Sequence, residues 1–427
     1  MPATGVCTAR VAGMAPAVIR NLWHRRHRQW VMLWPLALAQ MTSWGTLYYS
    51  FSLFSAPMQR ELGWSPTALN GALTCGLLVT GLVAYPIGGA LDRYGGRWLM
   101  TLGSLGAGLL LLVWSQVQSL AQFYVLWLTL GVCLACCLIE PLFAVVNQHF
   151  GSDARKGIIA VTMVTGFSGT VYVPLMGFLI AHLEWRSAML VLAALNLCFS
   201  APVHWIFVPP RVGGARRHSA RDVVRGRAVM RKRLRNPVFW GLALWYTSYS
   251  LTASSLIFQF VPLLRAEDVA DKIIFFAFAL IGPLQVAARI IIVTIARRAS
   301  IARLGAWTSS LVPLGVLVLI LAPHTLAWLC AFSTLFATGH GITTILRGTA
   351  PIEWLGREYF ARTMGAIALP MMFAMALAPS ITAQVWARSG SSRMMLCGIF
   401  VGSLFGTAGY WLAVISRRRA RRAALKP

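Results

Sequence analysis

The sequence predicts an all-α polytopic membrane protein whose transmembrane helices form two six-helix bundles. The chain of 427 residues is 58% hydrophobic and only 11% charged, whereas soluble domains are about 45–50% apolar and about 25% charged. Twelve apolar stretches long enough to span a bilayer follow one another along the chain. One long polar segment separates the first six stretches from the last six. A soluble enzyme, a disordered chain and a secreted disulfide scaffold are thereby excluded.

Hydropathy assigns these elements in order. The first six spans are expected at 30–54, 66–91, 98–115, 120–148, 157–182 and 186–208. The last six are expected at 237–264, 273–296, 306–322, 326–350, 363–387 and 394–415. The N-terminal bundle therefore covers 30–208 and the C-terminal bundle 237–415. Basic segments flank and join them: a tail at 1–29, a linker at 209–236 that begins with two prolines, and a tail at 416–427.

The positive charge of the chain is distributed as expected for membrane topology. Lys and Arg number 38 against 11 Asp and Glu. Thirty of the 38 fall in segments on the same side as the N-terminus, six on the opposite side and two within spans. Because cytoplasmic loops retain positive charge, we expect a multi-pass protein of a bacterial inner (plasma) membrane with both termini cytoplasmic. The same residues are expected to contact anionic lipids at that face rather than nucleic acid.

The loop between the second and third spans carries a motif, which we call the gate motif. Its residues stand in the pattern G-x-x-x-D-R-x-G-x-R, formed by Gly88, Asp92, Arg93, Gly95 and Arg97. A glycine allows close helix approach, a second glycine permits a turn with positive φ, and a carboxylate can meet the positive N-terminal end of a facing helix. Such a contact could hold two helices together in one conformation and release them in another.

The gate motif resembles the signature of the major facilitator superfamily. This resemblance implies two six-helix bundles that rock around a central site, with spans 1, 4, 7 and 10 bordering the cavity. Within the superfamily, the stretches SWGTLYYSFSLFSAPMQRELGWSPTALNGA and HFGSDARKGIIA look like the monocarboxylate and oxalate/formate transporter group. That group carries an acidic residue four positions before an arginine in span 8. Here Arg289 matches the arginine, but Gln285 replaces the acid, and span 1 contains no lysine.

Charged side chains within spans usually face a cavity or a partner, because each is costly to place in lipid. Arg289 is the leading candidate to bind a substrate anion, since a guanidinium offers a bidentate fork; a structural ion pair or snorkelling is the alternative. Glu140 is a candidate proton carrier, although permanent pairing with Arg93, Arg97 or another gate residue is favoured. Arg347 shares a helical face with His340, which could line a path or simply be a packing histidine.

Two polar helix faces are further candidates for the pathway wall. Trp245, Ser248, Thr252, Ser255 and Gln259 form one stripe on span 7, and Trp44, Tyr48 and Ser52 another on span 1. Hydrogen bonding between helices is the alternative role for such hydroxyl groups. On span 4, Cys133, Cys136 and Cys137 could bind a soft metal ion, but no His or Met is spaced to complete the site. We therefore expect no metal, no cofactor and no catalytic residue.

The sequence thus predicts a monomeric secondary transporter that moves a small organic solute, expected to be an anion such as a monocarboxylate, by alternating access, with or without a coupling proton. A transporter of another solute, a drug or a soft metal, a non-transporting sensor, and a membrane-embedded transferase are the alternatives. The expected substrate-binding residues are Arg289, Trp44, Tyr48, Trp245, Ser248, Thr252, Gln285, His340 and Arg347.

Overall fold

The computed structural model describes residues 16–210, 220–294 and 299–424, and these residues form no strand. The first half contains α2 (Pro16–Ser43), the π-helix η1 (Trp44–Tyr49), α3 (Ser50–Leu62), α4 (Pro66–Tyr94), α5 (Gly96–Ser115), α6 (Leu120–Cys137), α7 (Ile139–Phe150), the 3-10 turn η2 (Gly151–Asp153), α8 (Ala154–Thr165), α9 (Ser168–Leu195), the π-helix η3 (Asn196–Ser200) and α10 (Ala201–Phe207). The second half contains α11 (Ala220–Leu234), α12 (Pro237–Ala266), α13 (Asp271–Thr294), α14 (Ile301–Leu321), α15 (Leu326–Leu355), α16 (Phe360–Ser389) and α17 (Ser392–Ala424).

The described helices account for the predicted membrane crossings. Nine helices in these ranges are long and apolar enough to cross a membrane. The longest, Ala154–Phe207, has 54 residues, which at about 1.5 Å per residue far exceeds the roughly 30 Å hydrocarbon core. Glu184, with φ of 59°, interrupts its helical backbone, so this segment crosses twice. The long helices formed by α2 through α3 and by α12 supply two more crossings. The predicted all-helical membrane fold is confirmed.

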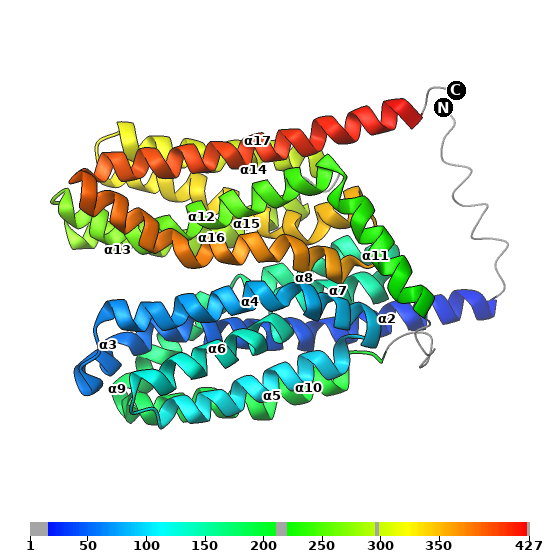
Figure 1. Cartoon of the computed structure of the whole chain (residues 1–427), viewed down its shortest axis with the longest axis horizontal. Coiled ribbons are helices and arrows are strands. Elements are labelled where there is room, and N and C mark those ends of the chain that lie inside the picture. The colour runs from blue at the N-terminus through cyan, green and yellow to red at the C-terminus, as the bar shows by residue number, and fades with distance from the viewer. Residues whose placement is uncertain (1–15, 211–219, 295–298, 425–427) are drawn as a thin grey trace.

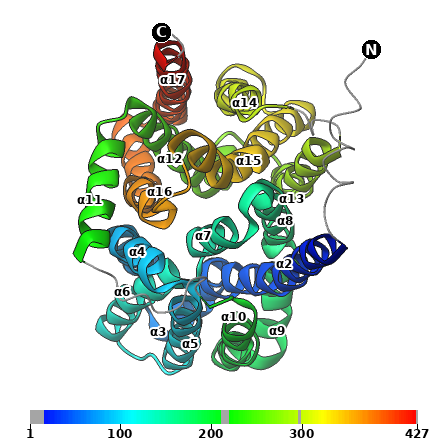
Figure 2. The same cartoon turned by 90° about the vertical axis from the view of Figure 1, so that its right-hand side faces the viewer.

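Figure 1 shows the helices of the first half lying beside those of the second half, with their long axes roughly parallel. Helix α2 begins and α17 ends at the same end of the molecule. We call this the terminal end and the opposite one the far end. Helix α11 also lies at the terminal end, where it crosses the long helices instead of running along them (Figures 1 and 2). Hydropathy predicts a polar linker at 209–236 and not this helix, because the segment is rich in charged residues and has no long apolar stretch.

The fourth predicted span is broken near its middle. Leu138 has extended backbone angles and separates α6 from α7. A broken helix leaves backbone groups unpaired inside the membrane, where they must find partners in the protein. Gln40 of α2 can supply them: with its amide turned so that donors face acceptors, the nitrogen donates to the carbonyl oxygens of Cys137 (3.3 Å) and Leu138 (3.2 Å), and the oxygen accepts the N–H of Ile139 (3.2 Å). This break sets the direction in which α7 leaves the N-terminal bundle.

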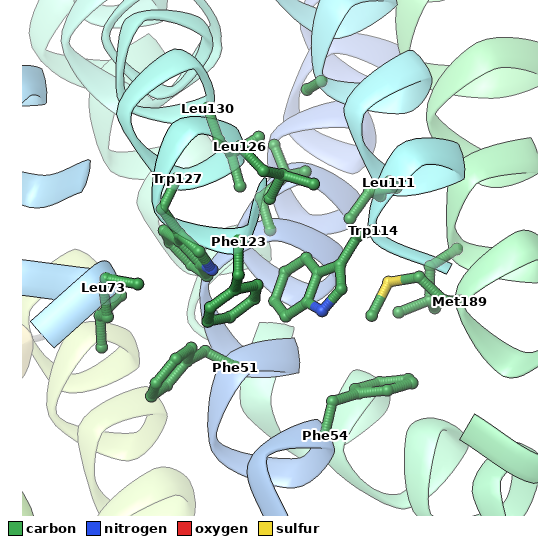
Figure 3. Close-up of a cluster of buried hydrophobic side chains, with 14 of the residues drawn as sticks. Phe51, Phe54, Leu73, Leu111, Trp114, Phe123, Leu126, Trp127, Leu130 and Met189 are labelled. Carbon is green, nitrogen blue, oxygen red and sulfur yellow. The ribbon is translucent and has the colours of Figure 1, made fainter. Parts of the chain in front are cut away.

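The far end of the N-terminal bundle is held by an aromatic core (Figure 3). Trp114 is fully buried and its indole N–H donates to the sulfur of Met58 at 3.3 Å. The rings of Trp114 and Trp127 meet edge to face, with centroids 5.2 Å apart. Side chains from α3, α4, α5, α6 and α9 complete the core, among them Phe51, Phe54, Leu73, Leu111, Phe123, Leu126, Leu130 and Met189. This end is therefore a rigid support for the more polar middle of the bundle.

The Gln40 contact predicts a stability effect. We expect Gln40→Leu to lower the melting temperature in detergent, because it leaves the backbone groups at the break unpaired, at a cost of about 1–3 kcal/mol for each such group. Gln118→Leu at an exposed turn is the matched control and should change the melting temperature little. Equal melting temperatures for the two variants would show that Gln40 does not stabilise the break.

Candidate functional site

Asp92 lies in the last turn of α4 and joins the two bundles at the terminal end. Its carboxylate oxygens accept the backbone N–H of Ala361 at 3.2 Å and of Arg362 at 2.9 Å. These residues begin α16, whose first N–H groups have no partner within the helix and carry partial positive charge. The carboxylate therefore caps a helix of the opposite bundle, which is the kind of contact that the spacing of the gate motif predicts.

Two glycines allow α4 and α16 to approach closely beside this contact. A Cβ atom on Gly88 would lie 2.3 Å from the carbonyl oxygen of Ala361, and one on Gly365 would lie 2.3 Å from the carbonyl oxygen of Ala84. Neither atom could be accommodated unless the helices moved apart. Gly88 was predicted for this role, whereas Gly365 belongs to no motif and could not be singled out from the sequence.

Gly95 and Arg97 shape the turn between α4 and α5. Gly95 has the predicted positive φ, 84°, and its N–H donates to the carbonyl of Leu91 at 2.9 Å. Arg97 Nε donates to the carbonyl of Val208 at 2.8 Å, which ties the end of α10 to this turn. Arg93 is exposed and its guanidinium lies 5.0 Å from the centre of the Tyr94 ring.

Glu140 forms a second polar contact between the bundles. It lies in the first turn of α7, directly after the break, and forms an ion pair with Arg347 of α15. The two side chains are only 18% and 14% exposed. The favoured sequence interpretation, pairing with Arg93, Arg97 or another gate residue, was wrong about the partner. The break directs the start of α7 toward α15, a direction that hydropathy could not reveal.

Arg289 is buried in α13 between the bundles, with 3% of its surface exposed. Its Nη1 donates to the carbonyl of Thr162 in α8 at 2.8 Å, and Nε to the carbonyl of Gly341 at 3.3 Å. Its Nη2 donates to Thr344 Oγ1 at 3.1 Å and to Gln285 Oε1 at 3.5 Å. All four acceptors are neutral. Within the described ranges no carboxylate pairs with this guanidinium.

The group of the N-terminal bundle that accepts a hydrogen bond from Arg289 lies at the C-terminal end of α8. Thr162 lies in the last turn of α8, which stops at Thr165. Carbonyl groups at a helix C-terminus carry partial negative charge, so a cation is favoured there. A Cβ atom on Gly166 would lie 1.9 Å from Nη1 of Arg289, so only a glycine leaves room for the guanidinium. The sequence analysis did not connect Arg289 with this helix end.

Two tyrosines lie near the guanidinium: Tyr49 of η1 and Tyr249 of α12. The hydroxyl of Tyr249 is hydrogen-bonded to Nδ1 of His340 on α15. Tyr49 is 36% exposed although it lies in the middle of a bilayer-spanning helix. Hydroxyl, imidazole and guanidinium groups from both bundles therefore meet at one place, which we call the central site.

The sequence analysis singled out neighbours of these tyrosines. Trp44 and Tyr48 contact each other edge to face, with ring centroids 5.2 Å apart, and pack against the N-terminal core. The segment containing them is a π-helix, in which hydrogen bonds run from i to i+5, so the spacing of an α-helix does not describe its faces. Tyr49, the residue after Tyr48, lies near Arg289. No signal in the sequence marked the π-helix.

The polar stripe on span 7 lies inside the C-terminal bundle. Trp245 is 3% exposed and packs on Tyr410 of α17, with ring centroids 5.1 Å apart. Thr252 Oγ1 donates to the carbonyl of Ser248 at 2.9 Å, and Ser248 lies against Gly406 of α17. In this conformation Trp245, Ser248 and Thr252 pack within the bundle, and their place in the pathway wall stays a prediction. Tyr249 lies beside Trp245 and Thr252 on α12, where all three line one cavity, and its hydroxyl reaches His340.

The three cysteines of span 4 do not converge with other ligands. Cys133 Sγ would lie 3.0 Å from a Cβ on Gly106, and Cys136 Cβ 2.6 Å from one on Gly103, so both face α5. In the ranges 16–210, 220–294 and 299–424, no group of three or more His, Cys, Asp and Glu side chains is placed to hold a metal ion. These cysteines act as small packing residues between helices.

Several polar contacts join the two bundles at or near the terminal end. The Asp92 contact and the Glu140–Arg347 pair both join the bundles, and Arg155 of α8 adds a hydrogen bond to the carbonyl of Ala299 at 3.1 Å. At the far end the ion pairs Glu61–Arg186 and Arg265–Asp271 each stay within one bundle. Farther from the terminal end than Asp92, Thr74 of α4 donates to the carbonyl of Ala376 of α16 at 3.5 Å. Donor groups at the central site can bind an anion, and the contacts between bundles can open only when the bundles move.

Comparison with known proteins agrees with this architecture. The family model described as Major Facilitator Superfamily matches residues 36–379. An uncharacterized transporter of Bacillus subtilis (strain 168), YybO, is 21% identical over 191 residues, which cover 41% of this chain and 43% of the relative. The crystal structure of the human organic anion transporter MFSD10 (TETRAN) superposes with a TM-score of 0.66 and 18% identity, covering 91% of this chain and 99% of that one. The aligned region thus spans less than half of the bacterial relative, and the structural likeness shows the fold.

The close approach of α4 and α16 can be tested without a substrate. We expect Gly365→Ala to separate the helices, because the new Cβ would meet the carbonyl of Ala84 at 2.3 Å. The amides of Ala361 and Arg362 should then exchange hydrogen for deuterium about tenfold faster, since they lose the Asp92 carboxylate. Gly398→Ala, where nothing lies within 4 Å of the new Cβ, is the matched control. Unchanged exchange in Gly365→Ala would contradict the role given to this glycine.

Proposed function

We propose, from the premise that this chain belongs to the major facilitator superfamily of transporters, that it moves a small organic anion across the membrane by alternating access. It is a multi-pass membrane transporter and not an enzyme. The observation that carries the anion proposal is the buried guanidinium of Arg289, which has only neutral acceptors among the described residues. A buried cation without a counter-ion favours the binding of an anion.

A carboxylate is the substrate group that best fits this environment. A guanidinium binds a carboxylate through two parallel hydrogen bonds. The hydroxyls of Tyr49 and Tyr249, both near Arg289, can orient the rest of the solute. We propose that Gln285 and Thr344, which accept hydrogen bonds from Arg289, and Trp44 and Tyr48 of the neighbouring segment complete the wall of the site. Trp245, Ser248 and Thr252 are not part of this proposal.

Substrate binding and opening of the bundles are coupled in this proposal. In the present conformation Nη1 of Arg289 is occupied by the Thr162 carbonyl of the opposite bundle. A bound carboxylate would replace this carbonyl with a charged acceptor, and hydrogen bonds to charged groups are about twice as strong as neutral ones. The contact between α13 and α8 would then be lost without leaving a buried donor unpaired. Loss of one contact between bundles lowers the free energy needed to separate them.

The orientation of this cycle follows from the charge distribution. We place the terminal end in the cytoplasm, because it carries most of the lysines and arginines. The conformation described here is then closed toward the cytoplasm, and substrate would reach Arg289 from the far end. The gate motif and the Glu140–Arg347 pair would separate when the bundles rock to the other state.

Arg289 can be tested by ligand-induced thermal stabilisation of the purified protein. We expect carboxylates such as pyruvate or oxalate, but not their neutral amides, to raise the melting temperature. Arg289→Ala should weaken this binding at least about tenfold, which corresponds to about 1.4 kcal/mol. Arg289→Lys should retain only part of it, because a single ammonium cannot form the fork. Arg303→Ala, an exposed arginine near the terminal end, is the control and should bind as the wild type does. Unchanged carboxylate binding in Arg289→Ala would remove this residue from the site.

We also propose that Glu140 acts as a structural partner of Arg347 and not as a proton carrier. Glu140→Gln leaves a buried guanidinium unpaired and should lower stability by about 3 kcal/mol. The double variant Glu140→Gln with Arg347→Gln should recover much of this loss, because neither charge remains. A double-mutant cycle of melting temperatures measures this coupling. If Glu140→Gln kept the wild-type melting temperature but abolished the pH dependence of uptake, the proton-carrier role would hold instead.

A further inference from the structure

Helix α11 belongs to neither bundle and lies across the ends of the long helices at the terminal end (Figures 1 and 2). Its buried residues, Gly226, Met230 and Arg233, are spaced by four and three positions and so share one face, which we call the inner face. The face opposite to it is exposed. One face of such a helix packs on the protein and the other is exposed to lipid headgroups or solvent. A ligand that binds the exposed face can therefore affect the contacts that the packed face makes.

Side chains at the inner face bind the loop between α15 and α16. Arg233 Nη1 donates to the carbonyl of Tyr359 at 3.2 Å and to the hydroxyl of Thr363, and its Nη2 donates to the carbonyl of Gly356 at 3.4 Å. Arg225 at the edge of this face forms an ion pair with Glu358 at 2.8 Å. The linker helix therefore binds the loop that leads into α16 at Gly356, Glu358 and Tyr359.

This loop is the one on which the gate motif depends. Ala361 and Arg362, whose N–H groups bind Asp92, follow Tyr359 by two and three positions. Tyr359 has a φ of 48°, a left-handed conformation that side chains other than glycine rarely adopt and that needs support from its surroundings. Arg233 supplies this support through the Tyr359 carbonyl. Helix α11 thus positions the start of α16 to meet the carboxylate of the other bundle.

The outer face of α11 is strongly basic. Arg227, Arg231, Lys232 and Arg235 are exposed on it, and within the sequence of this helix only Asp222 is acidic. Two apolar side chains accompany them: Val224 is 64% exposed and Leu234 is 42% exposed. Trp240 at the start of α12 is 55% exposed, and its indole N–H donates to the carbonyl of Leu234 at 2.7 Å. Basic residues beside exposed apolar residues and an interfacial tryptophan are typical of segments at the headgroup level.

We propose that the outer face of α11 binds anionic phospholipid headgroups and that this binding favours the closed state of the gate motif. Mutual repulsion among the exposed cations weakens the docking of α11 on the loop. Anionic headgroups neutralise this repulsion and fix the helix at the membrane surface. The loop is then held in the conformation that presents Ala361 and Arg362 to Asp92. This inference rests on the gate role proposed for Asp92.

Hydrogen exchange of the full-length protein in lipid nanodiscs tests the inference without a substrate. We expect residues 356–363 to exchange about tenfold more slowly in phosphatidylcholine mixed with phosphatidylglycerol than in phosphatidylcholine alone. The variant Arg227→Gln, Arg231→Gln, Lys232→Gln should exchange at the fast rate in both lipids. The inner-face variant Arg233→Gln should exchange fast in both lipids too, because it loses the contact to the loop itself.

The matched control removes charge from the same membrane face at a helix that does not touch the loop. Arg418 and Arg419 are exposed near the end of α17, and Arg418→Gln with Arg419→Gln should leave the lipid dependence of residues 356–363 intact. Equal exchange in the two lipids for the wild type would overturn the inference. Equal loss of the lipid effect in the α17 control would do so as well, since it would assign the effect to the general surface potential. Arg289 is untouched in every variant, so carboxylate binding reports separately on the proposed transport function.

Discussion

A charged or unpaired polar group within the membrane must find its partner inside the protein, and the rest of this structure depends on that constraint. In this chain, three such polar groups have their partners in the opposite bundle. The carboxylate of Asp92 caps α16, Glu140 pairs with Arg347, and Arg289 caps the end of α8. Lipid could satisfy none of these groups, so each contact holds the bundles together with an energy that water at a soluble interface would largely cancel.

The same contacts make the closed state reversible. All three are polar and local, and small residues at Gly88, Gly166 and Gly365 let backbones and a guanidinium approach without interlocked side chains. The aromatic side chains of the Trp114 cluster all come from the N-terminal bundle. Between the bundles, small or aliphatic residues of α16, such as Met364 and Ala376, pack against the N-terminal bundle beside the polar contacts. This division suits rigid bodies that move relative to each other.

Helix α11 of the linker provides a further contact that can affect the balance between closed and open states. Arg233 binds the loop that leads into α16, and Arg225 pairs with Glu358 of the same loop. One short helix thereby connects a basic surface with the backbone groups that Asp92 binds. The central site has a comparable link, because the Arg289 guanidinium that is proposed to bind substrate also makes a contact between bundles. Ligand binding and membrane charge can both act on the balance between closed and open states through single side chains.

The sequence by itself determined the membrane class, the order of the helices, the two bundles and the gate motif, because hydropathy and turn chemistry are local properties of the chain. It also identified Arg289, Glu140 and Arg347 as the charges that require partners. Tertiary structure alone decided what those partners are. The break at Leu138 turned Glu140 toward Arg347, and a π-helix brought Tyr49 rather than Tyr48 beside Arg289. The span 7 stripe packs within its own bundle. Each of these outcomes depends on which helix lies opposite, and the packing of distant segments, not the local pattern, settles that.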